Sequence, residues 1–234
     1  MLGLYARKIG MTQVFDGSGN LMPVTVLRFD PNVVIAKKTK EIDGYNAVVI
    51  GLDDIKKNRL SKPLAGQFTK TSAEDNDSGD KKPNKKRIIR ETDITPKKRI
   101  LELRDFESAL KKEIVIGDSL GIEMLEGVRY VDVSGISKGK GFQGVVKRYG
   151  FGGGRKTHGS KFHREPGSTG QNTYPARTFK NRKLPGRMGR EKVTVLSLRV
   201  VKADPEKKLL LVKGAVPGIN KGLVFVRSAM KKGR

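Results

Sequence analysis

Residues 135–190 constrain the fold of this chain more than any other stretch, because they can contribute almost nothing to a hydrophobic core. They hold fourteen Lys or Arg, thirteen glycines, six aromatic residues and a single acid, Glu165. No window has apolar residues at helical spacing, and no run alternates apolar and polar residues for more than a few positions. The pattern predicts neither a buried helix nor an ordinary pair of strands, but a long loop shaped by a partner.

The sequence on both sides of this segment consists of short runs rich in Val, Ile and Leu, bounded by Gly, Pro, Asn or Asp. Such runs are typical of β-strands. The step Asp204-Pro205 predicts a hairpin turn between two of them. Many short strands with few helical stretches favour an all-β barrel or sandwich, which pairing of the two ends of the sequence would close. The predicted strands cover residues 21–29, 32–38, 46–52, 127–135, 192–201, 209–214 and 223–228.

The predicted fold is mainly β, with three parts. Ser61 and Pro63 predict the start of a short helix in the second part, residues 104–113 predict another helical turn or two, and the polar residues 72–86 predict a mobile surface loop. The parts are a β-barrel core from residues 1–55 and 191–234 with parts of 87–134, a small α/β insertion from 56–115, and an extended loop from 135–190.

The net charge of +25 requires a polyanion nearby in the working state, since such a surface attracts nucleic acid or anionic lipid. About half of it lies in residues 135–190. The absence of cysteine excludes disulfides and thiolate metal sites, and suits a reducing compartment. We see neither a signal peptide nor a membrane-spanning run, and expect no membrane association.

Residues 139–144, GKGFQG, match the dinucleotide-binding pattern G-x-G-x-x-G. The sequence that follows is expected to form no helix, which argues against a dinucleotide site. His158, His163 and Glu165 suggest a metal site only weakly, because the surrounding cations oppose binding of another cation. We predict no enzymatic activity, no metal and no cofactor.

RNA binding fits residues 135–190 best. Lys and Arg neutralise phosphates, glycines let the main chain approach the RNA backbone, and aromatic rings stack on unpaired bases. A DNA-compacting protein, a nucleotide-dependent enzyme and a solvated basic linker remain as alternatives. The sequence contains none of the usual DNA-binding motifs, which argues against a DNA-compacting protein. A solvated basic linker would not explain the six aromatic residues.

The chain contains, in this order, GLYARKIGMTQVF, GISKGKGFQGVVKRYGFGGG, THGSKFHREPGSTGQN, LPGRMG, VTVLSLRVV and LLLVKGAVPG. Together these runs resemble the bacterial form of large-subunit ribosomal protein three. The resemblance implies a translation-factor-like closed β-barrel from the N- and C-terminal parts, with a long loop toward the peptidyl-transferase region. It also implies a cytoplasmic structural constituent of the large ribosomal subunit that binds the 3′-terminal domain of the ribosomal RNA early in assembly.

The resemblance further implies contacts with ribosomal proteins fourteen and nineteen. Gln171 matches a glutamine that is methylated in some family members, which makes a glutamine methyltransferase a possible partner. The insert at residues 74–87 has no assigned role. The implied RNA-binding residues are Lys138, Lys140, Phe142, Lys147, Arg148, Arg155, Lys156, His158, Lys161, His163, Arg164, Arg177, Lys180, Arg182, Lys183, Arg187 and Arg190.

Overall fold

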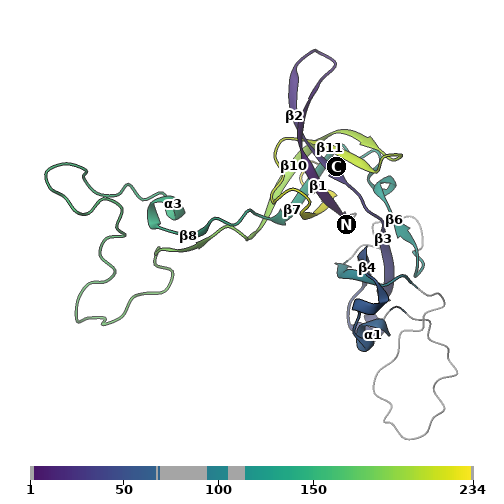
Figure 1. Cartoon of the computed structure of the whole chain (residues 1–234), viewed down its shortest axis with the longest axis horizontal. Coiled ribbons are helices and arrows are strands. Elements are labelled where there is room, and N and C mark those ends of the chain that lie inside the picture. The colour runs from purple at the N-terminus through teal and green to yellow at the C-terminus, as the bar shows by residue number, and fades with distance from the viewer. Residues whose placement is uncertain (1–2, 67, 69–93, 105–113, 233–234) are drawn as a thin grey trace, which may run out of the picture. The chain divides into compact units, whose positions relative to one another are not determined.

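The structure, a computed structural model, describes residues 3–66, 68, 94–104 and 114–232 (Figure 1). It is mainly β, as predicted from the sequence. The chain divides into two compact units. We call residues 1–135 with 194–234 the core unit, and Ile136–Val193 the basic unit. Each unit is described by itself below.

Six strands close into a hydrogen-bonded ring in the order β1-β12-β7-β10-β11-β2. The ring joins the two ends of the sequence, because Gly3 of β1 pairs with Arg227 of β12. Within the ring, each strand is therefore paired on both sides over at least part of its length. Apolar side chains such as Leu4, Leu27 and Val133 are fully buried. The strands are β1 (Gly3–Phe15), β2 (Leu21–Arg28), β7 (Tyr130–Ile136), β10 (Lys192–Asp204), β11 (Leu209–Lys213) and β12 (Leu223–Ser228).

The predicted hairpin around Asp204-Pro205 is present, with Asp204 of β10 paired to Leu209 of β11. Strand β1 was not predicted. Its pattern is interrupted where the register shifts between Lys8 and Gly10. Lys8 is buried, and its ammonium donates hydrogen bonds to the carbonyl oxygens of Val216, at 2.7 Å, and Gly218, at 3.2 Å. A buried lysine and a mid-strand glycine hide this strand from a search for apolar runs.

A second sheet has the strand order β5-β4-β3-β6. Residues 32–38 and 46–52, predicted as strands of the barrel core, pair with each other in this second sheet instead. Val34 and Ile50 of this sheet nevertheless belong to the same hydrophobic cluster as Leu27 of the ring. Apolar pattern therefore indicates burial but not which sheet a strand joins. The strands are β3 (Asn32–Lys38), β4 (Ala47–Asp54), β5 (Lys97–Arg104) and β6 (Ser119–Leu120).

Short helices connect these strands. The helix predicted at Ser61 is α2, although the Ser61 side chain makes no capping hydrogen bond. The surface loop expected at 72–86, the insert at 74–87 and nearly all of the helical turn expected at 104–113 lie outside the described residues. Among the described residues of the core unit, the helices are α1 (Lys40–Asp43), η1 (Lys57–Arg59), α2 (Lys62–Ala65) and η4 (Ile122–Leu125).

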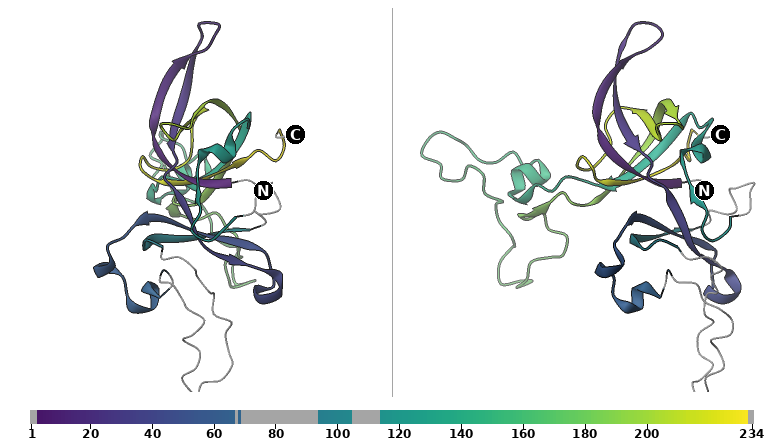
Figure 2. Two further views of the ribbon diagram at one scale, coloured as in Figure 1. Left: turned by 90° about the vertical axis from the view of Figure 1, so that its right-hand side faces the viewer. Right: turned by 45° about the vertical axis from the view of Figure 1, so that its right-hand side comes forward.

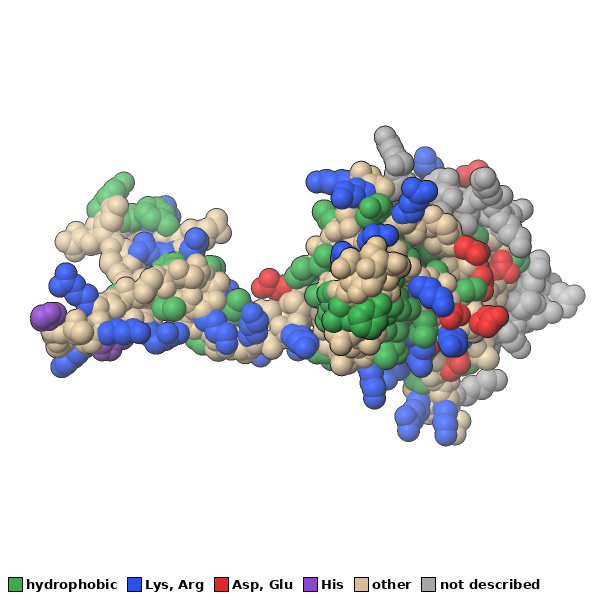
Figure 3. Space-filling view, turned by 90° about the horizontal axis from the view of Figure 1, so that it is seen from above, with side chains coloured by type: hydrophobic (Ala, Val, Ile, Leu, Met, Phe, Trp, Pro, Cys, Tyr) green, Lys and Arg blue, Asp and Glu red, His purple; other side chains and the backbone are tan. Residues whose placement is uncertain are grey.

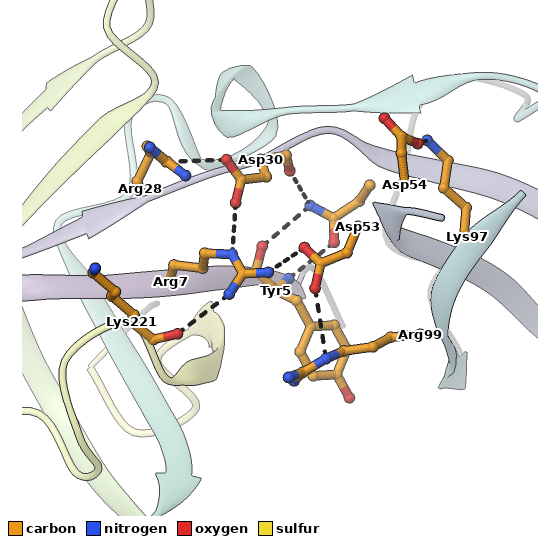
Figure 4. A network of polar contacts seen from close by, with 10 residues as sticks. Tyr5, Arg7, Arg28, Asp30, Asp53, Asp54, Lys97, Arg99 and Lys221 are labelled. Atoms are coloured by element: carbon orange, nitrogen blue, oxygen red, sulfur yellow. Dashed lines mark hydrogen bonds and ion pairs between the residues drawn. The ribbon is translucent and has the colours of Figure 1, made fainter. Parts of the chain in front are cut away.

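Arg7 connects the ring to the second sheet inside the core unit (Figure 4). Its Nε lies 2.9 Å from an oxygen of Asp30, and its guanidinium also binds the carboxylate of Asp53 in β4. The other Asp53 oxygen lies 3.6 Å from Nε of Arg99 in β5. The hydrogen bond to Asp53 raises the pKa of Arg7 above its ordinary value. Arg7 and Arg99 thus each have a carboxylate partner, which is what partial burial requires.

Strands β1 and β2 continue past the ring as a hairpin (Figures 1 and 2). The pairing of β1 with β12 ends at Arg7, whereas its pairing with β2 runs on to Phe15. Several large apolar side chains of this hairpin are exposed, namely Ile9, Met11, Phe15 and Leu21. In the part of the chain that the structure describes, no helix has the length and hydrophobicity needed to span a bilayer.

Candidate nucleic-acid interface

The basic unit has almost no hydrophobic core. Val145 is the only buried hydrophobic residue in positions 136–193, all of which are described. A short antiparallel ribbon joins β8 (Gly141–Gln143) to β9 (Gly186–Met188). The amide of Lys140 also donates to the carbonyl oxygen of Met188 at 2.9 Å. The two limbs of the segment are thus held together mainly by main-chain hydrogen bonds.

A five-residue helix, α3 (Val145–Tyr149), follows β8. The prediction that no helix follows residues 139–144 was therefore wrong. The helix is too short for its apolar residues to show a helical period in the sequence. Tertiary contacts stabilise it, because Val145 is buried and Arg148 donates to the carbonyl oxygen of Leu184 at 2.7 Å. The Arg148 guanidinium lies so close to Gly186 that any Cβ there would collide with it. A side chain at position 186 would therefore have to displace this flexible guanidinium.

Residues 154–163 close into a compact turn. The amide of Gly154 donates to the carbonyl oxygen of His163 at 3.1 Å, and Nδ1 of His163 lies 3.0 Å from the carbonyl oxygen of Arg155. A Cβ at Gly154 would overlap the carbonyl oxygen of Phe162, so only glycine fits. Both histidines lie at one end of the basic unit (Figure 3). Glycine thus permits the close main-chain approach that shapes this basic turn.

Most of the predicted RNA-binding side chains are exposed, and Phe142 is 71% exposed. Arg148 is the exception, being half-buried beneath the return limb. Among the described contacts, no ion pair involves a Lys or Arg of the basic unit. Figure 3 shows these cations spread along the visible face of the unit. The charge is therefore available to a partner.

The predicted residues fall into groups instead of one site. Two groups surround cavities: one includes Lys138, Lys140, Arg148 and Arg187, the other Gln171 and Arg177. The exposed Gln171 lies in the loop that Ser168 begins, where the Ser168 hydroxyl donates to the carbonyl oxygen of Gly170 at 2.8 Å. The remaining residues lie outside both cavities: Phe142 and Arg190 on or beside the ribbon, Lys147 in α3, Arg155, Lys156, His158, Lys161, His163 and Arg164 in or beside the compact turn, and Lys180, Arg182 and Lys183 on the return limb.

Tyr149 was not among the predicted site residues. Its ring is 38% exposed at the end of α3. The guanidinium carbon of Arg148 lies 5.0 Å from the ring centroid, and Nζ of Lys183 lies 5.9 Å from it. Lys183 is distant in sequence, so only the fold could reveal this pairing. The available signal was the presence of an aromatic residue within a basic, glycine-rich run.

Comparison with known proteins gives a consistent result. The family described as "Ribosomal protein L3" matches residues 108–208. The chain is 51% identical to "Large ribosomal subunit protein uL3" of Treponema denticola over 234 residues, covering 100% of both chains. It is 49% identical to the protein of the same name from Treponema pallidum, again over the whole of both chains. The protein of that name from Borrelia hermsii is 45% identical over 233 residues.

Proposed function

This chain belongs to the ribosomal protein L3 family, and we propose that it serves the large ribosomal subunit by binding its RNA through the basic unit. As a family member it is a structural constituent of the subunit and not an enzyme, and it works in the cytoplasmic ribosome. The RNA contact proposed here uses the seventeen residues predicted from the sequence. The bound region is the 3′-terminal domain of the large-subunit RNA, engaged early in assembly, with the basic unit directed to the peptidyl-transferase region.

One observation carries the proposal. The cations of the basic unit lie on a segment with a single buried hydrophobic residue, and none of them is ion-paired within the described contacts. Unneutralised charge of this density repels itself in the free protein and is stabilised by phosphates. A main chain rich in glycine permits that approach, and five exposed aromatic rings offer stacking surfaces.

Two finer parts of the proposal concern proteins. The exposed apolar side chains of the β1–β2 hairpin support contacts with neighbouring ribosomal proteins, fourteen and nineteen being the expected ones. The exposure of Gln171 supports access by a glutamine methyltransferase. The core ring is proposed to be the translation-factor-like barrel of the family, with residues 135–190 as its extended loop and 56–115 as its insertion.

The test is the salt dependence of RNA binding. The full chain is titrated with a transcript of the 3′-terminal domain of large-subunit RNA between about 50 and 200 mM salt. Replacement of Arg155, Lys156, Lys161 and Arg164 by Ala removes four cations near the compact turn. We expect weaker binding and a slope of log K against log salt that is flatter by roughly 3. The matched control removes four exposed cations of the core unit, Lys202, Lys207, Lys208 and Lys213.

An unchanged slope in the fourfold variant would contradict the proposed role of the compact turn. Equal loss of slope in the core-unit control would contradict the assignment of RNA binding to the basic unit. Competition with a duplex DNA of equal charge separates RNA binding from general polyanion binding. DNA that displaces the transcript at equal concentration would favour the DNA-compacting alternative.

A further inference from the structure

A cavity of about 450 Å³ lies in the basic unit beside the ribbon and α3. This volume falls within the range of clefts that hold small organic ligands. Its walls come from three stretches that are separated in sequence. Side chains that matter for its chemistry are Lys138, Lys140, Arg148, Tyr149, Arg187 and Glu191.

The cavity is strongly cationic. Its lining holds four basic residues and one acidic residue, Glu191. Lys138, Lys140 and Arg187 take part in no ion pair among the described residues. Arg148 is fixed in place by its hydrogen bond to the carbonyl oxygen of Leu184. The cavity therefore favours a ligand that carries negative charge.

The same cavity has an aromatic wall. The guanidinium carbon of Arg148 lies over the Tyr149 ring, 5.0 Å from the ring centroid. Nζ of Lys183, from the return limb, lies 5.9 Å from the same centroid. Tyr149 is the last residue of α3, and Gly150 after it has the left-handed conformation. An aromatic ring and a guanidinium plane are the two surfaces on which unpaired bases stack. A ligand with both a flat ring and a phosphate satisfies both walls at once.

We propose that the Tyr149 cavity holds one unstacked nucleotide of the bound RNA. The base packs against Tyr149 and the Arg148 plane, and its phosphate is neutralised by Lys138, Lys140 and Arg187. This inference rests on the proposed function and makes it more specific. The cavity beside the ribbon binds a nucleotide whose base is unstacked, whereas the compact turn contacts phosphates of the RNA backbone.

Substitutions at Tyr149 test the base contact with the full chain and the 3′-domain transcript. Tyr149→Leu keeps an apolar side chain but removes the ring, and should weaken binding roughly 5- to 100-fold. Tyr149→Phe keeps the ring and should bind within about twofold of the parent. Because neither substitution changes charge, the salt slope should stay the same in both. Lys138→Gln with Lys140→Gln should instead flatten the slope by roughly 1 to 2.

Tyr45 provides a matched control. It too lies beside two cations, Lys38 at 5.1 Å and Arg104 at 4.6 Å, but in the core unit, where Glu102 neutralises Lys38. Tyr45→Leu removes the same kind of ring and should leave RNA affinity unchanged. Circular dichroism of each variant verifies that the fold is intact.

Crosslinking of the parent complex needs no variant. Ultraviolet irradiation followed by trypsin and ribonuclease should yield a nucleotide adduct on Tyr149, within the peptide of residues 149–155. Adducts elsewhere in the basic unit but none at Tyr149 would overturn the inference. So would a Tyr149→Leu variant that binds as tightly as the parent while the fourfold Ala variant is weakened. If neither variant is weakened, the proposed function itself fails.

Discussion

The core unit and the basic unit differ in the interactions that stabilise each of them internally. In the core unit one hydrophobic cluster runs from Leu4 and Leu27 in the ring to Val34 and Ile50 in the second sheet. In the basic unit Val145 alone is buried, and main-chain contacts through glycine set the path. The core unit can therefore fix its own shape by apolar burial, whereas the basic unit has almost no apolar burial to hold it.

Proteolysis of the free chain should reveal this difference most clearly. Trypsin is expected to cleave within residues 138–190 roughly tenfold or more faster than within the core strands, because the segment lacks apolar anchoring. A time course followed by mass spectrometry gives the order of the cuts. Bound RNA transcript should protect the segment. Equal cleavage rates in both units of the free chain would remove the distinction drawn here.

Truncation of a core side chain tests the other half of the comparison. Leu27 is fully buried, so Leu27→Ala should lower the free energy of unfolding by about 2–5 kcal/mol. Val145→Ala should change it by less than about 0.5 kcal/mol, because its contacts lie in the other unit. Urea unfolding followed by circular dichroism measures both. A comparable loss from Val145→Ala would mean that the two units unfold together.

The Arg7 junction sharpens the comparison within the core unit. Arg7→Ala leaves Asp30 and Asp53 without their shared guanidinium, and should cost about 1–3 kcal/mol of unfolding free energy. Arg7→Lys keeps the charge but loses the planar fork, so an intermediate loss is expected. Exposed Arg28→Ala, which removes only the 3.0 Å contact to Asp30, is the control. If Arg7→Ala is no worse than this control, the junction contributes nothing beyond a surface pair.

The smallest effect is a pH dependence confined to the second sheet. Hydrogen bonding from Lys38 holds the pKa of Glu102 below its usual range. Because the folded pKa is lowered, this stabilisation is present above the unfolded value of about 4.3 and is lost as pH falls through the folded value. Glu102→Gln should remove that part of the decline in stability below about pH 4.

The sequence predicted the parts of the fold that have a simple period. The strands at 32–38 and 223–228 were predicted with the bounds that the structure has. Strand β1 was missed because its buried Lys8 is satisfied by carbonyl oxygens more than 200 residues away in the chain. A contact of that range leaves no local signal.

The candidate site was only partly accessible from sequence. Charge and glycine content predicted the position of the basic unit, because both can be counted directly in the sequence. The pairing of Tyr149 with Lys183, and the anchoring of Arg148 on Leu184, depend on how the two limbs meet. The helix α3 exists because of that meeting, and not because of intrinsic preference in its five residues.

Closure of the ring by β1 and β12 has a consequence for synthesis on a translating ribosome. Gly3 finds its partner Arg227 only after nearly the whole polypeptide has emerged, so β1 waits with one side unpaired. The basic unit, with its glycines and cationic side chains, is synthesised before β12. The basic unit is therefore synthesised while the ring of the core unit is still open, and the ring can close only after the basic unit has been made.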